Sequence, residues 1–186
     1  RGKGRDEASS FCRHRLSLPK PFCPGPLRKF RSLSELTPLQ YAVAGPDLWN
    51  FLLSAPNIYS WVGIGFSTNG QMIGSSAMVG WVSKNGTGII KQYYLKGMDP
   101  THVQPNQGDL NVVENSTMAF MHSKRIYLAF QLSTVQPQTE LLYAVGPIGQ
   151  RPNASDGYRL AKHRDQISTV LDYDKGNDNL EYSSSC

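Results

Sequence analysis

Several features that would identify a function directly are missing from this 186-residue sequence. No apolar run approaches the roughly 20 residues that a membrane-spanning helix needs. Neither G-x-S-x-G nor H-E-x-x-H occurs, which argues against hydrolases of those types. The Gly-rich segment 69–74 lacks the lysine of a phosphate-binding loop. The three cysteines form no C-x-x-C pair, so neither a zinc knuckle nor a thioredoxin-type site is encoded.

The basic excess is confined to the N-terminal part of the chain, although the formal net charge is +5. Residues 1–40 hold nine Lys and Arg, three acidic residues and five of the 12 prolines, whereas the remainder holds 10 basic and 11 acidic residues. We therefore expect an irregular, basic, Pro-rich arm over 1–40 and no nucleic-acid-binding face on the domain that follows. The chain begins without Met and shows no signal-peptide pattern, so we expect it to be part of a longer product.

Cysteines and sequons point weakly to an oxidising, secretory compartment. Cys12 and Cys23 are close enough in sequence to form a loop-closing disulfide, and the pairing of Cys186 stays open. Three N-x-[ST] sequons mark candidate glycosylation sites at Asn85, Asn115 and Asn153.

The residue pattern from about Trp49 onward is that of short strands. Runs rich in Val, Ile, Tyr, Phe and Trp alternate with Gly, Asn, Pro and Ser clusters, and no segment has convincing helical periodicity. These runs predict strands over 47–55, 61–66, 76–83, 88–95, 125–133, 140–146 and 167–173, with a weaker one over 110–114. Seven or eight short antiparallel strands indicate an all-β fold, a β-sandwich.

The strand expected over 61–66 alternates large and minimal side chains. Gly63 and Gly65 leave one face nearly bare, and the other face is apolar, formed by Val62, Ile64 and Phe66. Because glycine weakens a strand, it usually marks a close approach by another backbone or by a ligand. The bare face fits a flat ligand and fits close sheet packing equally well.

One thioether and one imidazole are candidate metal ligands. Met72 lies in a Gly-flanked loop directly after this strand, and His163 lies in the loop before the last predicted strand. Sulfur and imidazole nitrogen together suit haem iron. The two residues are 91 positions apart, so only the fold can bring them together. Taken singly, a methionine is usually a gap filler in a core.

The segment 61–81, with its strand and its Gly-flanked Met72, resembles a DOMON domain of the plant cytochrome b561 and DOMON domain-containing proteins. Further matching segments lie at 45–56, 107–109, 127–131, 141–147 and 159–163. The resemblance runs from about Tyr41 to Gly176. It implies a DOMON domain over 41–176, followed by a C-terminal tail over 177–186 that leads to a transmembrane region absent from this sequence.

The resemblance implies an immunoglobulin-like antiparallel β-sandwich that binds haem b non-covalently, with Met72 and His163 as axial ligands of the iron. We expect the walls of the cleft to include Val62, Ile64, Phe66 and Tyr93 or Tyr94. In full-length relatives the domain is extracellular, on the apoplastic face of a membrane. There it precedes a membrane-embedded cytochrome b561 core that is linked to ascorbate. An electron carrier is therefore favoured over a catalyst with its own substrate site.

Two departures and one alternative accompany this interpretation. Residues 25–40 do not follow the family pattern, so we hypothesise a locally altered segment that lacks the first strand. Arg164 stands where many relatives have Asp, which leaves Asp165 or a backbone carbonyl to hold the second ring nitrogen of His163. The alternative function is a haem-free, sugar-binding module that stacks its ligand on Trp81, Tyr93 and Tyr94. A fragment that folds poorly for lack of its first strand is a third possibility.

Overall fold

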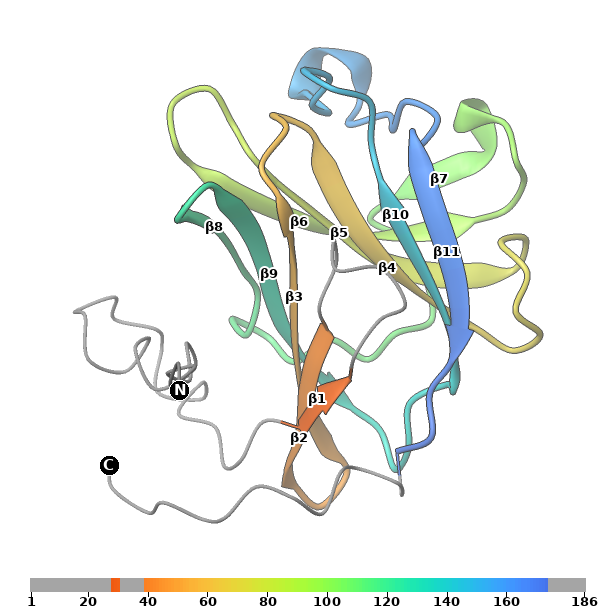
Figure 1. Cartoon of the computed structure of the whole chain (residues 1–186). Coiled ribbons are helices and arrows are strands. Elements are labelled where there is room, and N and C mark those ends of the chain that lie inside the picture. The colour runs from red at the N-terminus through yellow and green to blue at the C-terminus, as the bar shows by residue number, and fades with distance from the viewer. Residues whose placement is uncertain (1–27, 31–38, 174–186) are drawn as a thin grey trace, which may run out of the picture.

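The computed structural model describes residues 28–30 and 39–173. The described residues form two antiparallel sheets that pack face to face (Figure 1). The all-β sandwich predicted from the sequence is therefore confirmed. Cys12, Cys23, Cys186 and the tail over 177–186 lie outside the described residues.

The first sheet has five strands in the order β1-β2-β3-β9-β8. Their bounds are β1 Arg28–Phe30, β2 Leu39–Gly45, β3 Leu48–Pro56, β9 Arg125–Ser133 and β8 Met118–His122. The second sheet has six strands in the order β11-β10-β4-β5-β6-β7. Their bounds are β11 Asp165–Val170, β10 Glu140–Val145, β4 Trp61–Ser67, β5 Ser75–Val82, β6 Gly88–Leu95 and β7 Val103–Pro105. Two short 3-10 helices, η2 Pro100–His102 and η3 Ala154–Asp156, lie in the loops.

Most predicted strands are observed close to their predicted bounds. β6 and β9 have the predicted bounds, β4 and β10 differ by one residue at one end, and β3 and β5 differ by one residue at both ends. The last strand begins two residues and ends three residues before its prediction. The prediction of a weaker strand over 110–114 is wrong, because Val112 makes only an isolated bridge with Leu132.

Part of the expected irregular arm is regular structure. Arg28–Phe30 form β1, which pairs antiparallel with β2, and β2 itself begins at Leu39, inside the expected arm. The prediction of an irregular segment over the whole of 1–40 is therefore wrong at these positions. A short strand, β1, lies beside β2 at the edge of the first sheet, and the local alteration of residues 25–40 stays a hypothesis.

The main core lies between the two sheets and is rich in aromatic rings. Phe51 of β3 stacks on Phe130 of β9 with ring centroids 5.3 Å apart, and Phe66 of β4 meets Phe51 edge-on at the same distance. Ring pairs of this kind add to the stability gained from burial. Val62 and Ile64 share the apolar face of β4 with Phe66 and are buried in this core.

A second buried layer covers the outer face of the second sheet. Its members are Trp61, Ala77, Val79, Trp81, Tyr93, Leu95, Val103 and Leu160. Loop residues cover this layer: the Tyr93 hydroxyl donates to the Tyr158 carbonyl oxygen at 2.8 Å, and the Tyr158 ring lies 6.0 Å from that of Trp81. The second sheet is thus buried on both faces, and its outer face can form a site.

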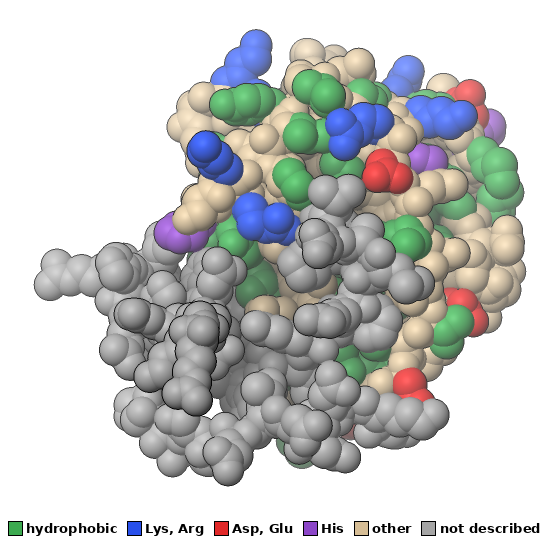
Figure 2. Space-filling model, in the orientation of Figure 1, with side chains coloured by type: hydrophobic (Ala, Val, Ile, Leu, Met, Phe, Trp, Pro, Cys, Tyr) green, Lys and Arg blue, Asp and Glu red, His purple; other side chains and the backbone are tan. Residues whose placement is uncertain are grey.

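Neither the surface charge nor the helices of the described residues indicate a particular binding partner. The face in Figure 2 carries Lys and Arg side chains, mainly over its upper part, together with acidic and apolar side chains, so it is not continuously basic. Among the described residues, no helix has the length and apolar character needed to cross a membrane.

Candidate functional site

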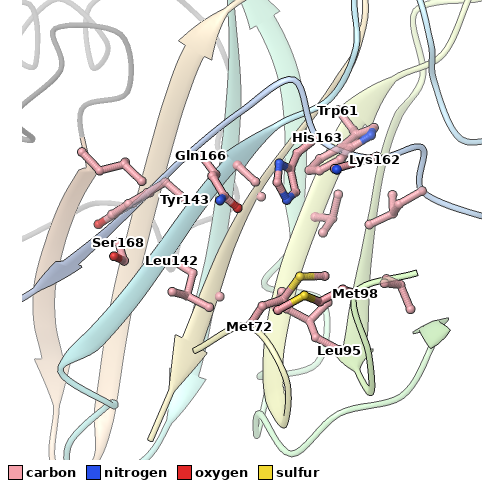
Figure 3. A pocket seen from close by; sticks show the side chains of 18 of the residues that line it. Trp61, Met72, Leu95, Met98, Leu142, Tyr143, Lys162, His163, Gln166 and Ser168 are labelled. Atoms are coloured by element: carbon pink, nitrogen blue, oxygen red, sulfur yellow. The ribbon is translucent and has the colours of Figure 1, made fainter. Parts of the chain in front are cut away.

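A cavity of about 510 Å³ opens on the outer face of the second sheet (Figure 3). This volume lies within the range of roughly 300–1,000 Å³ found for small-molecule and cofactor sites. β4, β5 and β10 form its floor, and three loop segments and β11 form its walls. The segments are the β4–β5 loop, the chain around η2 and the chain over 160–163.

The glycines of β4 form the bare part of the floor. A Cβ atom at Gly63 would lie 3.1 Å from Val79 Cγ2, and one at Gly65 would lie 3.3 Å from Leu142 Cβ. Side chains at these positions would therefore crowd the neighbouring strands and occupy the cavity. The bare strand face that the sequence indicates faces this cavity, whereas Val62, Ile64 and Phe66 face the core between the sheets. Their predicted role as walls of the cleft is wrong.

Met72 lies on a turn that several hydrogen bonds hold. The Gly74 N–H donates to the Leu95 carbonyl oxygen at 2.8 Å, which ties the turn to the end of β6. The hydroxyls of Ser67 and Ser75 donate to the Gln71 carbonyl oxygen at 2.9 and 2.7 Å. Gly74 has a positive φ of 86°, a conformation that glycine adopts without strain. The half-buried Met72 side chain packs against the outer apolar layer and lines the cavity.

His163 lies on the opposite wall of the cavity. The N–H of the next residue, Arg164, donates to the Val145 carbonyl oxygen at 2.8 Å, which fixes this segment against β10. Burial and then the Lys162 ammonium lower the pKa of His163 below its usual value. A hydrogen bond with its own backbone carbonyl and the Asp165 carboxylate oppose this shift. The neutral imidazole, the form that can bind a metal, is therefore favoured near pH 7.

The structure thus brings both predicted ligand residues to one cavity. Met72 and His163 come from loops at opposite ends of the sequence of the domain, yet both line the cavity from facing sides (Figure 3). Their role as iron ligands stays a prediction.

Met98 is a lining residue that the sequence interpretation missed. Its side chain is 71% exposed, and Figure 3 shows it on the same side of the cavity as Met72. It follows β6 in a short Lys-Gly-Met segment with no periodicity. The only sequence signal was a second methionine beside a glycine, just after a strand of the same sheet.

The aromatic residues predicted to contact a ligand, Trp81, Tyr93 and Tyr94, do not line the cavity. Trp81 and Tyr93 have no exposed surface, so the prediction that they stack on a sugar is wrong. Tyr93 and the half-buried Tyr94 do not line the cavity, so their predicted role as its walls is also wrong.

The three sequon asparagines are exposed, as glycosylation requires. Asn85 lies in the turn between β5 and β6, where its side-chain oxygen accepts from the Thr87 N–H at 3.1 Å. Asn153 caps η3 and accepts from the Asp156 N–H at 3.2 Å. Asn115 has a positive φ of 58°. Their modification stays a prediction.

The residues of the cavity fit a haem. A porphyrin supplies the in-plane nitrogens of its iron, so the protein needs to add only two axial donors, and a thioether with an imidazole is a known pair. The glycine floor leaves space for a flat ring, and Leu95, Val103 and Leu160 make the surroundings apolar. The described residues contain no group of three or more His, Cys, Asp or Glu suited to a metal ion bound by protein alone.

Fold and cavity together define the class: an antiparallel β-sandwich with a cavity outside one sheet. Two solved structures share the fold. The cytochrome b domain of pyranose dehydrogenase from Coprinopsis cinerea has a TM-score of 0.53 and 13% identity, covering 78% of this chain and 80% of that one. The cytochrome domain of Myriococcum thermophilum cellobiose dehydrogenase has a TM-score of 0.50 and 15% identity, covering 78% and 82%.

The family follows from the sequence comparisons. The DOMON domain model matches residues 50–142, so this chain belongs to the DOMON domain family, as its sequence motifs predict. Two Arabidopsis thaliana proteins, both named cytochrome b561 and DOMON domain-containing protein, are similar to it. One is 47% identical over 143 residues, which is 76% of this chain and 38% of the relative. The other is 35% identical over 179 residues, which is 91% of this chain and 43% of the relative. The chain therefore spans about two fifths of these relatives.

Proposed function

We propose that this chain is an electron-transfer domain that binds one haem b between Met72 and His163. The observation that supports this most strongly is the presence of a thioether and a neutral imidazole on facing walls of one apolar cavity. The names of the Arabidopsis relatives and of the structures with the same fold agree with it.

Each part of the cavity has a definite task in this function. His163 and Met72 donate the two axial ligands, and Gly63 and Gly65 keep the floor flat. Leu95, Val103 and Leu160 exclude water from the cavity, and this favours binding of the apolar haem ring. Bound haem supplies one-electron chemistry at its iron.

Filling both axial positions with protein donors leaves no open coordination site. The site therefore suits outer-sphere electron relay and does not suit oxygen activation. This is why an electron carrier is a better proposal than a catalyst with its own substrate.

The names of the relatives support one part of the setting that we propose for the relay, its membrane partner. We propose that the domain passes electrons to or from a membrane-embedded cytochrome b561 domain, with a small reductant such as ascorbate as the ultimate donor. We place it on the extracellular, apoplastic side of that membrane. The support is the paired naming of both modules in the Arabidopsis relatives.

Haem titration of the full chain tests the proposal. We expect one haem per chain and a low-spin, six-coordinate absorption spectrum. His163→Ala removes one axial ligand, so it should abolish the low-spin spectrum and weaken haem binding by about tenfold or more. His122→Ala is the matched control, because His122 lies on β8 of the other sheet and is exposed. No haem uptake, or a His163→Ala spectrum like that of the control, would overturn the proposal.

A further inference from the structure

Met98 is a cavity residue to which the proposed ligation assigns no role. A large apolar side chain gains little from burial when it is 71% exposed, so packing does not explain its position. It nevertheless lines the same cavity as Met72 and His163. Figure 3 shows the sulfur atoms of both methionines on one side of the cavity, with His163 across from them.

The two methionines reach the cavity from loops that are tied together. The hydrogen bond from the Gly74 N–H to the Leu95 carbonyl oxygen joins the β4–β5 loop to the end of β6 at 2.8 Å. Met72 lies two residues before Gly74, and Met98 lies three residues after Leu95. This bond therefore joins the two backbone segments from which the methionine side chains reach the cavity.

The loop that carries Met98 is braced from within. The Lys96 N–H donates to the His102 carbonyl oxygen at 3.0 Å, and the His102 N–H donates to the Asp99 carbonyl oxygen at 2.9 Å. A Cβ atom at Gly97 would lie 2.9 Å from His102 Cβ, so the loop closes tightly there. The main chain at Met98 is thus held at the mouth of the cavity, while its unbranched side chain has the rotational freedom to reach inward.

We propose that Met98 is a second thioether ligand, which binds the iron opposite His163 when the sulfur of Met72 is withdrawn. This inference rests on the proposed haem function. Both side chains offer the same soft donor atom, so exchange preserves the chemistry of the axial position. Met72 is the resident ligand because it is half-buried and packed against the outer apolar layer, whereas Met98 must leave solvent to bind.

Three variants of the full chain test this exchange by spectroscopy after haem titration. Met72→Ala should keep a low-spin spectrum and the weak long-wavelength charge-transfer band of ferric iron bound by methionine sulfur. Met98→Ala should match the wild type, because Met72 is still present. The double variant should lose the band and the low-spin spectrum, and its haem affinity should fall by about tenfold or more. A Met72→Ala spectrum identical to that of the double variant would overturn the inference.

Methionine oxidation gives a second readout that does not depend on redox activity. In the haem-bound wild type, chloramine-T should oxidise Met98 and spare Met72, as peptide mass spectrometry would show. In haem-bound Met72→Ala, Met98 should become protected, while exposed Met121 on β8 is oxidised in every sample. Equal oxidation of Met98 with and without haem in Met72→Ala would contradict the inference.

The failures of the two proposals are distinguishable. If the wild type takes up no haem, both proposals fall. If the wild type binds haem with a low-spin spectrum that requires His163, but Met72→Ala loses sulfur ligation, only the exchange of methionines is wrong.

Discussion

The two faces of β4 and β10 serve regions of opposite character. Toward the other sheet, Ile64, Phe66 and Leu141 fill a closed core. Away from it, glycines and the side chains of Leu142 and Ala144 border an open cavity. Because side chains alternate along a strand, every second residue of one strand packs into the core and the others form the floor of the cavity.

The difference teaches which positions set stability and which set binding. The core is held by large interlocking side chains that exclude any ligand. The side chains of the outer layer surround the cavity, and the loops beside that layer supply Met72 and His163. Substitutions in the two regions should therefore separate loss of fold from loss of cofactor.

The largest effect should come from the core. Phe130→Ala removes a ring that stacks on Phe51 and meets Phe66 at a centroid distance of 6.3 Å. The cavity that it leaves should lower the free energy of unfolding by about 3–5 kcal/mol. Denaturant titration of the haem-free chain measures this loss. A loss below about 1 kcal/mol would show that the aromatic core is not what holds the sheets together.

Gly65→Val should break binding while sparing the fold. Its side chain fills the floor beside Leu142, so haem affinity should fall by about tenfold or more. The free energy of unfolding should change by less than about 1 kcal/mol, because valine favours strands and Leu142 can shift. Gly45→Val in β2 is the matched control: among the described residues, a Cβ there meets only Leu48 Cβ, at 3.9 Å. Equal haem affinities for both variants would contradict a floor at Gly65.

Replacing a tyrosine by phenylalanine should change the free energy of unfolding in opposite directions in the core and in the outer layer. The buried Tyr143 hydroxyl has no hydrogen-bond partner in the described part of the chain, so Tyr143→Phe should raise the free energy of unfolding by about 1 kcal/mol. Tyr93→Phe removes the donor to the Tyr158 carbonyl oxygen and should lower it by about 1 kcal/mol. Thermal melting of both variants measures the pair, and effects of the same sign would refute this difference between the layers.

The smallest effect is a pH dependence of the core. Burial raises the pKa of Tyr143 and Tyr173 above the ordinary value, with nearby tyrosines adding to the shift. The unfolded chain releases these protons at about pH 10. The stabilisation is therefore complete below that pH and declines as the pH rises, by about 0.4 kcal/mol for each tyrosine at pH 10. Denaturant titrations from pH 8 to 10.5 should show a shallower decline in Tyr143→Phe; an equal decline would contradict the assignment.

Much of the fold was predictable because period-two alternation is strong in the central strands. β9 alternates Ile126, Leu128, Phe130 and Leu132 on one face, and its bounds were predicted correctly. The missed strands carry weaker signals. β7 has three residues and ends in proline, and β8 is half exposed. β1 lies in a basic, Pro-rich segment, and β2 directly follows that segment and is exposed toward its end.

The sequence predicted that Met72 and His163 meet at one site, and both line the cavity, whereas their role as ligands stays a prediction. The resemblance pointed to Met72 and His163, and the glycine alternation marked the strand beside them. The prediction of the cavity walls was wrong for β4. It assigned the apolar face of this strand to the ligand, but the opposing sheet covers that face. Met98 was missed because its place at the cavity depends on how the loop after β6 folds, and no periodicity reveals that.

The most direct test of the account is a crystal structure of the full chain with haem bound. The account predicts a porphyrin on the outer face of the second sheet, over Gly63 and Gly65, with its iron between the Met72 sulfur and an imidazole nitrogen of His163. A porphyrin bound at another place, or iron coordinated without His163, would contradict it.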